Sequence, residues 1–291
     1  MSTETWERVL WKQQPFPDNY IPDSFLSALK KNANFRPYSY WPLSLASCAV
    51  TQHISILFIF LVTFVHIYDA SWDPRILVWL SIGMFIVGYL VWEILEIYIF
   101  GTRLGDFTSL ANALKSSVLV FLSLLALSPV LRTLTASTSS DSIWALTSCL
   151  LGLNVLLGDY TPPRDPKRIR ERLTSVLSMN AAMSGSVVLA SRLQDDISVF
   201  ALMLFSIQMF ALFPILRTRI LLTPPATRIL LTITLTGLSV YLTCKVSTIV
   251  TCILICILVF VTFAAPAMLV WSQKYKNELR GPWDVAVPQV R

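Results

Sequence analysis

Residues 47–68 read SCAVTQHISILFIFLVTFVHIY, a run of 22 residues that holds no Asp, Glu, Lys or Arg. An α-helix rises about 1.5 Å per residue, so a helix of this length crosses the hydrocarbon core of a bilayer, which is about 30 Å thick. Further apolar segments of comparable length follow at residues 76–99, 114–131, 143–158, 173–191, 197–216, 229–244 and 247–271. The sequence therefore predicts about eight transmembrane segments.

The composition identifies lipid as the main solvent of the chain. Hydrophobic residues make up 55% of it and charged residues 14%, whereas soluble domains carry about 25% charged residues. Backbone amides in hydrocarbon must be hydrogen-bonded within the segment, and the apolar runs lack the alternation of barrel strands. We expect an all-α polytopic membrane bundle (residues 44–271), flanked by an amino-terminal segment (1–43) and a carboxy-terminal tail (272–291).

The basic residues fall on alternate sides of the apolar segments. Of the 23 Lys and Arg residues, 19 lie in the two end segments and in every second connection, if Lys115 at the edge of the segment 114–131 is counted with the connection before it. The other connections hold only Arg75, Arg132, Arg192 and Lys245. Because basic connections remain in the cytosol, both termini are predicted to face the cytosol. This rule also explains the net charge of +6, so the charge does not indicate nucleic-acid binding.

Two segments outside the apolar runs could touch the membrane surface. We expect residues 1–43 to form short amphipathic helices that lie along the bilayer or against a partner, the second ending at Lys30 and Lys31. The connection 161–172 carries five basic residues, a cluster that could attract anionic lipid. The topology rule is sufficient to explain the same cluster.

Two groups of residues inside the segments are candidates for contacts. Ser178, Ala182, Ser186 and Ala190 recur every four residues, a spacing that lets two helix backbones approach closely, either within this bundle or against another membrane subunit. Glu93 and Glu96 share a helical face near the cytosolic end of the second segment. They are interpreted as a polar cluster between helices, or as a contact for a partner or a polar substrate.

The residues do not assemble a reaction centre. His53 and His66 lie near opposite ends of the first segment, too far apart to act as one site. The five cysteines are expected to be small packing residues without a metal site. No nucleophile, base and orienting group can be combined, and the adjacent Asp195 and Asp196 suit a solvated turn. The residues alone predict no catalytic, cofactor-binding or metal-binding site and a non-catalytic membrane protein, with a lipid scramblase or transporter as the alternative.

Several short motifs carry a family resemblance. Residues 14–20, QPFPDNY, resemble the amino-terminal signature of the PIG-C family, which supplies a membrane subunit of the phosphatidylinositol N-acetylglucosaminyltransferase complex. Further blocks that resemble this family are SPVLRTLT at 128–135, SMN at 178–180, LASRL at 189–193, IQ at 207–208, FALFP at 210–214 and GPWD at 281–284. The blocks are distributed over nearly the whole chain.

The resemblance implies a subunit of an endoplasmic reticulum complex that transfers N-acetylglucosamine from UDP-GlcNAc to phosphatidylinositol, the first step of GPI-anchor biosynthesis. It implies that another subunit is the catalytic glycosyltransferase. This multi-pass chain would then be an accessory component without cofactors, which scaffolds the catalytic subunit and helps to present the lipid acceptor. Its partners would be that subunit, the other membrane subunits, and membrane lipid including phosphatidylinositol.

An exposed aromatic segment is the expected partner interface. A rigid, aromatic patch on an otherwise apolar protein is typical of an interaction surface. The residues assigned to it are Pro15, Phe16, Pro17, Asp18, Asn19, Tyr20 and Trp283.

Overall fold

The computed structural model describes residues 11, 13–17, 20, 30–32, 37–100, 107–135, 137–160, 173–276 and 279–280. The chain folds as two compact units, a larger one of residues 41–266 and a smaller one of residues 1–40 and 267–291. Its first helices are α1 (Tyr40–Tyr68), α2 (Pro74–Phe100), α3 (Phe107–Thr133), α4 (Ser140–Leu157) and α5 (Leu173–Ala190). They are followed by α6 (Asp196–Ile207), η1 (Gln208–Leu212), α7 (Phe213–Ile220), α8 (Pro225–Val246), α9 (Thr248–Val259), η2 (Phe260–Ala264) and α10 (Ala265–Ser272). The predicted helical membrane bundle is confirmed in this coarse form.

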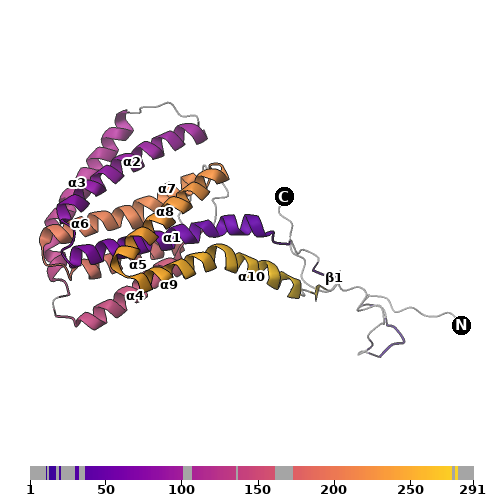
Figure 1. The fold of residues 1–291 in the computed structure, drawn as a ribbon. Helices are drawn as coiled ribbons and strands as arrows, with labels where there is room; N and C mark the ends of the chain where they lie inside the picture. Colours follow the sequence, from indigo (N-terminus) through magenta and orange to yellow (C-terminus); the bar gives the residue numbers. More distant parts are fainter. Residues whose placement is uncertain are drawn as a thin grey trace. The chain divides into compact units, whose positions relative to one another are not determined.

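The core of the larger unit lies along α1 and α6. Phe60 of α1 is fully buried and its ring packs on Phe205 and Phe210, with centroids 6.5 and 5.0 Å away. Both α2 and α3 pack against α6 (Figure 1). Most of the Leu, Ile and Val side chains of α2, α3, α8 and α9 face outward. An apolar outer surface is stable in lipid, where the backbone is already hydrogen-bonded within each helix.

The start of α1 and the ends of α4 and α7 meet at one end of the larger unit, because Arg217 bonds to the Ala49 and Asp159 carbonyls. We call the end where α1 begins and α4 and α7 finish the proximal end, and the opposite one the distal end. At the distal end, Arg132 of α3 pairs with Asp196 at the start of α6, with Nη1 and Oδ1 3.1 Å apart. Which side of the membrane each end faces remains a prediction.

Seven of the eight expected spans are found as helices long and apolar enough to cross a membrane among the described residues. The fifth, α5, is 18 residues long, as α4 is, and its stretch Ser175–Ala190 is apolar, so the count of eight stays a prediction. Helix α5 packs against α4 and α6, and Ala182, Ser186 and Ala190 are fully buried. A helix enclosed by protein can carry small and polar residues that a lipid-facing helix cannot.

Two crossings contain π-helical turns, η1 and η2, each followed closely by a proline. Pro214 and Pro266 lack the N–H that would bond to the carbonyl four residues earlier, so the ladder shifts by one residue. Phe213 accordingly donates its N–H to the carbonyl of Gln208, five residues before it, and Ala265 donates to Phe260. The prolines therefore lie within continuous crossings.

Four of the five cysteines, expected to pack inside the bundle, are exposed on its outer surface. Only Cys48 is buried. The sulfhydryl group is small and apolar enough to face lipid as readily as protein. The expectation that the cysteines fill the core was therefore wrong for the other four.

The smaller unit joins residues from both ends of the chain. Strand β1 (Lys30–Lys31) pairs antiparallel with β2 (Leu279–Arg280). Lys30 and Lys31 were expected to finish a short helix, and this expectation was wrong because their strand partner lies far away in sequence. The rest of that helix, 23–29, lies outside the described residues.

Candidate functional site

A buried polar junction occupies the proximal end of the larger unit. We define it by His53 of α1, Asn154 of α4, Tyr160 after α4, Ser178 of α5 and Arg217 of α7. These residues lie on four helices and on the segment that leaves α4. The junction therefore joins four helices of the bundle through polar groups.

The local sequence after α4 explains how Tyr160 reaches the junction. Helix α4 ends at Leu157, and Gly158 follows with φ −59° and ψ 137°. A Cβ atom on Gly158 would lie 2.8 Å from Cζ and Oη of Tyr160 and 3.1 Å from Nδ1 of His53. The absence of a side chain at this position lets the tyrosine fold back onto α1.

A continuous chain of hydrogen bonds links α1, α4 and α5. The two ring nitrogens of His53 lie 2.9 Å from Tyr160 Oη and 2.8 Å from Asn154 Oδ1. The Asn154 amide donates to the carbonyl and to the hydroxyl of Ser178, at 2.9 and 3.0 Å, and Ser178 Oγ donates back to the Asn154 carbonyl at 2.6 Å. Tyr160 donates its hydroxyl proton to the carbonyl of Val155 at 2.7 Å.

Arg217 connects the junction to α7. Its side chain is 6% exposed. One guanidinium nitrogen donates to the Ala49 carbonyl at 3.2 Å, another to the Asp159 carbonyl at 3.0 Å, and Cζ lies 5.6 Å from the centre of the Tyr160 ring. A buried cation is costly without such partners, and the carbonyl and aromatic contacts offset part of that cost.

Burial also controls the protonation of Tyr160. It raises the pKa of the phenol to about 12, while the positive charge of Arg217 acts in the opposite direction. The phenol is therefore neutral near pH 7 and keeps the proton that it donates to Val155.

The neighbouring turns of α1 extend these contacts to α8 and η2. Gln52 donates its amide to Thr232 Oγ1 at 2.9 Å. On another face, Ser44 donates to the Thr262 carbonyl at 3.0 Å, and Thr51 Oγ1 lies 2.8 Å from Thr262 Oγ1. The beginning of α1 is thus hydrogen-bonded to helices on several sides, and the geometry suits joining and orienting helices.

The acidic pair predicted from the sequence lies outside this junction. Glu96 pairs with Arg219 of α7, with Oε2 and Nη1 3.5 Å apart, and the guanidinium carbon lies 4.8 Å from the centre of the Trp92 ring. Glu93 instead accepts a hydrogen bond from Tyr89 on its own helix, at 2.7 Å. The structure therefore gives the two glutamates different partners.

The small-residue row lies inside the bundle. Ser178 is 5% exposed, and Ala182, Ser186 and Ala190 are fully buried. A Cβ atom on Gly185, one position from the row, would lie 3.3 Å from Leu151 of α4. Close approach of α4 and α5 is what these small residues allow.

The predicted partner segment forms a tight turn where it is described. The N–H of Tyr20 donates to the Pro17 carbonyl at 2.9 Å, and the rings of Phe16 and Tyr20 stack with centroids 4.5 Å apart. Pro15 and Tyr20 are exposed. Asp18, Asn19 and Trp283 lie outside the described residues, as does the basic connection 161–172.

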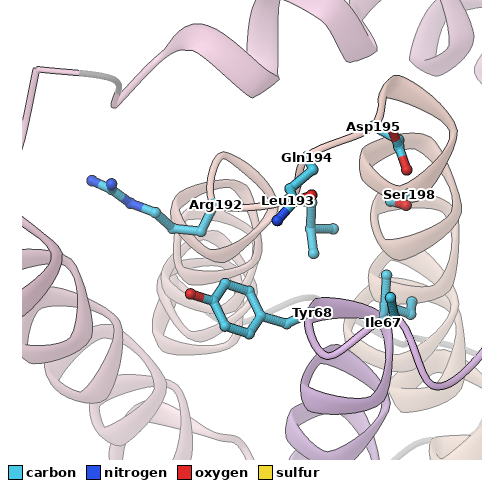
Figure 2. A pocket seen from close by; sticks show the side chains of 8 residues that line it. Ile67, Tyr68, Arg192, Leu193, Gln194, Asp195 and Ser198 are labelled. Atoms are coloured by element: carbon cyan, nitrogen blue, oxygen red, sulfur yellow. The ribbon is translucent and has the colours of Figure 1, made fainter.

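A small pocket lies at the distal end of the larger unit. Figure 2 shows it between the end of α1 and the turn from α5 to α6, and its volume is about 60 Å³. A space of this size holds several water molecules. Arg192 extends away from Gln194 and Asp195 and donates to the Thr138 carbonyl at 2.7 Å.

Comparison with known proteins decides the family. Residues 6–284 match the family described as phosphatidylinositol N-acetylglucosaminyltransferase. The chain belongs to this family. It is 37% identical over 287 residues to the phosphatidylinositol N-acetylglucosaminyltransferase GPI2 subunit of Schizosaccharomyces pombe, covering 98% of this chain and 87% of that one. It is 30% identical to the corresponding phosphatidylinositol N-acetylglucosaminyltransferase subunit of Homo sapiens, covering 97% and 92%. No solved structure matches.

Membership of the phosphatidylinositol N-acetylglucosaminyltransferase family confirms the resemblance carried by the short motifs. The junction itself was not predicted from them. Asn154 and Tyr160 were not singled out, and Arg217 was counted only as a topological charge. The amide of Asn154 inside the apolar run 143–158 and Gly158 at the end of that run were the available signals. His66, by contrast, stacks on Trp72 at 4.5 Å and takes no part in the junction.

Proposed function

We propose that this chain is a non-catalytic, multi-pass endoplasmic reticulum subunit of the complex that transfers N-acetylglucosamine from UDP-GlcNAc to phosphatidylinositol. In this role it holds the catalytic subunit at the bilayer and helps to present the lipid acceptor. Its family and the relatives named above support a place in the complex. The observation that carries the scaffold role is the junction, in which His53, Asn154 and Arg217 all bridge between elements of the bundle.

The proposal places the proximal end in the cytosol. Arg217, Arg219 and Arg228 lie at this end, and the basic connection 161–172 leaves from it. Basic residues are retained on the cytosolic side during insertion. The sugar nucleotide, the catalytic domain and the junction are then on the same side of the membrane.

Positional rigidity is the physical contribution of such a subunit. Holding two reactants in a productive geometry removes translational and rotational freedom before the reaction and can lower a barrier by about 7 kcal/mol or more. Helices that are tied by buried hydrogen bonds keep a docked enzyme at one height and angle relative to the lipid. The junction supplies these ties at the end proposed to carry the enzyme.

We further propose that the turn at Phe16 and Tyr20, together with Asp18, Asn19 and Trp283, contacts the partner subunits. A turn already closed by a backbone hydrogen bond and a ring stack loses little entropy when it binds. Exposed aromatic side chains are the usual anchors of such interfaces. The turn therefore combines preorganisation with an aromatic surface.

Pull-down of the complex tests this interface. Phe16→Ala combined with Tyr20→Ala should release the partners in mild detergent, because both rings of the stack are removed. Trp11→Ala is the matched control, since Trp11 lies in the same segment and is 88% exposed but is not part of the turn. Full recovery of partners with the double variant would contradict the assignment.

Reconstitution tests the function as a whole. The purified chain is placed in liposomes alone and with the other subunits, with labelled UDP-GlcNAc and phosphatidylinositol. The proposal expects sugar transfer only in the complete mixture, and loss of transfer when this chain is omitted. Transfer by the chain alone would identify it as the enzyme, and lipid or solute movement by the chain alone would identify a scramblase or transporter.

A further inference from the structure

The two ends of the chain are hydrogen-bonded to each other next to the end of α10. Beyond the β1–β2 ladder, the side-chain amide of Asn32 donates to the Lys276 carbonyl at 2.9 Å. The Gln273 side chain accepts from the Tyr38 N–H at 2.8 Å and donates to the Tyr38 carbonyl at 3.2 Å. We call the described residues of this region, 30–32, 37–38, 273–276 and 279–280, the terminal clasp.

The clasp concentrates positive charge. Its β ladder places Lys30 opposite Arg280 and Lys31 opposite Leu279. Lys274 and Lys276 lie just before β2 in the sequence. In the sequence, Arg36 and Glu278 fall between these residues, outside the described part of the chain. Like charges at facing positions of a ladder repel each other, so an anion at this surface would stabilise the pairing.

Aromatic side chains accompany these cations. Lys274 Nζ lies 4.5 Å from the centre of the Trp271 ring and 4.9 Å from that of Tyr275. The two rings meet edge to face at 5.4 Å, and they are 61% and 62% exposed. Trp and Tyr are enriched where a membrane meets water, so this group has the composition of a bilayer interface.

We propose that the terminal clasp binds the anionic phospholipid headgroups of the bilayer in which the chain is embedded. Topology alone requires basic residues on one side of the membrane, but it does not require that segments from opposite ends of the chain pair and bring those residues together. Basic residues beside an interfacial aromatic group attract acidic headgroups. The inference rests on the proposed function only in placing the clasp on the cytosolic face, where anionic lipids are concentrated.

The test measures binding of phosphatidylserine to the purified full chain by native mass spectrometry in detergent. Each lysine near an anionic surface is worth about fivefold in affinity. Lys274→Gln combined with Lys276→Gln should therefore weaken binding about 25-fold, while Lys274→Arg should retain it. Gln273→Ala keeps every cation but removes both bonds to Tyr38, and it should also weaken binding.

Lys245→Gln is the matched control, since Lys245 Nζ lies 5.5 Å from the Tyr241 ring at the distal end of α8. This variant should bind lipid as the wild type does. Unchanged binding by the double lysine variant, or an equal loss with Lys245→Gln, would overturn the proposal. If the double lysine variant binds lipid as the wild type does but no longer recovers the other subunits, the proposal is overturned in favour of an acidic protein partner. Sugar transfer by the reconstituted complex is scored separately, so the clasp and the scaffold role can fail independently.

Discussion

Replacing Gly158 by Ala should destabilise the chain through the Tyr160 side chain. The new methyl group would lie 2.8 Å from Tyr160 Cζ and Oη, so the ring must move. Moving it breaks the hydrogen bonds of Tyr160 to His53 and to the Val155 carbonyl, which contribute about 1 kcal/mol each.

The opposing effect is smaller. At φ −59° and ψ 137° alanine adopts the backbone conformation without strain, and Gly→Ala reduces the entropy of the unfolded chain by about 0.4–1 kcal/mol. The net loss is therefore about 1–2 kcal/mol. Titration with sodium dodecyl sulfate in mixed micelles, followed by circular dichroism, measures the free energy of unfolding.

Gly152→Ala is the matched control, since Gly152 lies inside α4 and a Cβ atom there has nothing within 4 Å. This variant should gain up to about 1 kcal/mol from helix propensity. Opposite signs at two glycines six residues apart would identify the tyrosine contact as the cause. A Gly158→Ala chain as stable as the wild type would refute the reasoning, as would additivity of Gly158→Ala and Tyr160→Ala, because the two share one contact.

Three further outcomes are expected from the same region. Arg217→Lys should lower the free energy of unfolding by about 1–3 kcal/mol in the same titration, because one ammonium group cannot reproduce a fork that bonds two carbonyls; equal stability would contradict this. Because burial raises the pKa of Tyr160 to about 12, above the value of about 10 for an unfolded tyrosine, its contribution to stability is complete below about pH 10 and is lost as the pH rises toward 12. The wild type should lose stability more steeply than Tyr160→Phe over that interval, and parallel curves would contradict the assignment. Ala182→Leu should destabilise the isolated chain by about 1–3 kcal/mol through overpacking, whereas a row that served only another subunit would leave the isolated chain unchanged.

Sequence patterns predicted the bounds of the apolar helices. The run 47–68 and α1 end at the same residue, Tyr68, because hydropathy measures the tendency of a segment to leave water. The run 173–191 and α5 also agree to within one residue, although α5 packs against α4 and α6 and its buried positions are small. Hydropathy therefore reports which segments leave water, and it does not distinguish a helix inside the bundle from one that faces lipid.

The polar contacts could not be predicted in the same way because they depend on long-range geometry. His53 and Tyr160 are 107 residues apart, and Arg217 and Ala49 are 168 apart. Helical periodicity relates only residues that are close in sequence, so it cannot pair residues this far apart. Glu93 and Glu96 share a face in sequence, yet only Glu96 pairs with α7, since pairing depends on where Arg219 lies. An isolated amide or cation in an apolar run indicates that the residue makes a polar contact, but the sequence does not show which residue is its partner.

The uneven placement of these contacts has a consequence for a scaffold. Apolar side chains contact lipid as favourably as they contact one another, so apolar burial alone does not orient helices in a membrane, and hydrogen bonds and shape must do so. In this bundle the first half of α1 bonds to α8 through Gln52 and to η2 through Ser44 and Thr51. His53 adds a bond to Asn154 of α4, and Arg217 of α7 bonds to the Ala49 carbonyl of α1. If this chain positions an enzyme at its proximal end, the helices at that end must be the ones that deform least. On this argument, loosening the junction should impair sugar transfer by the complex before it releases the partner subunits.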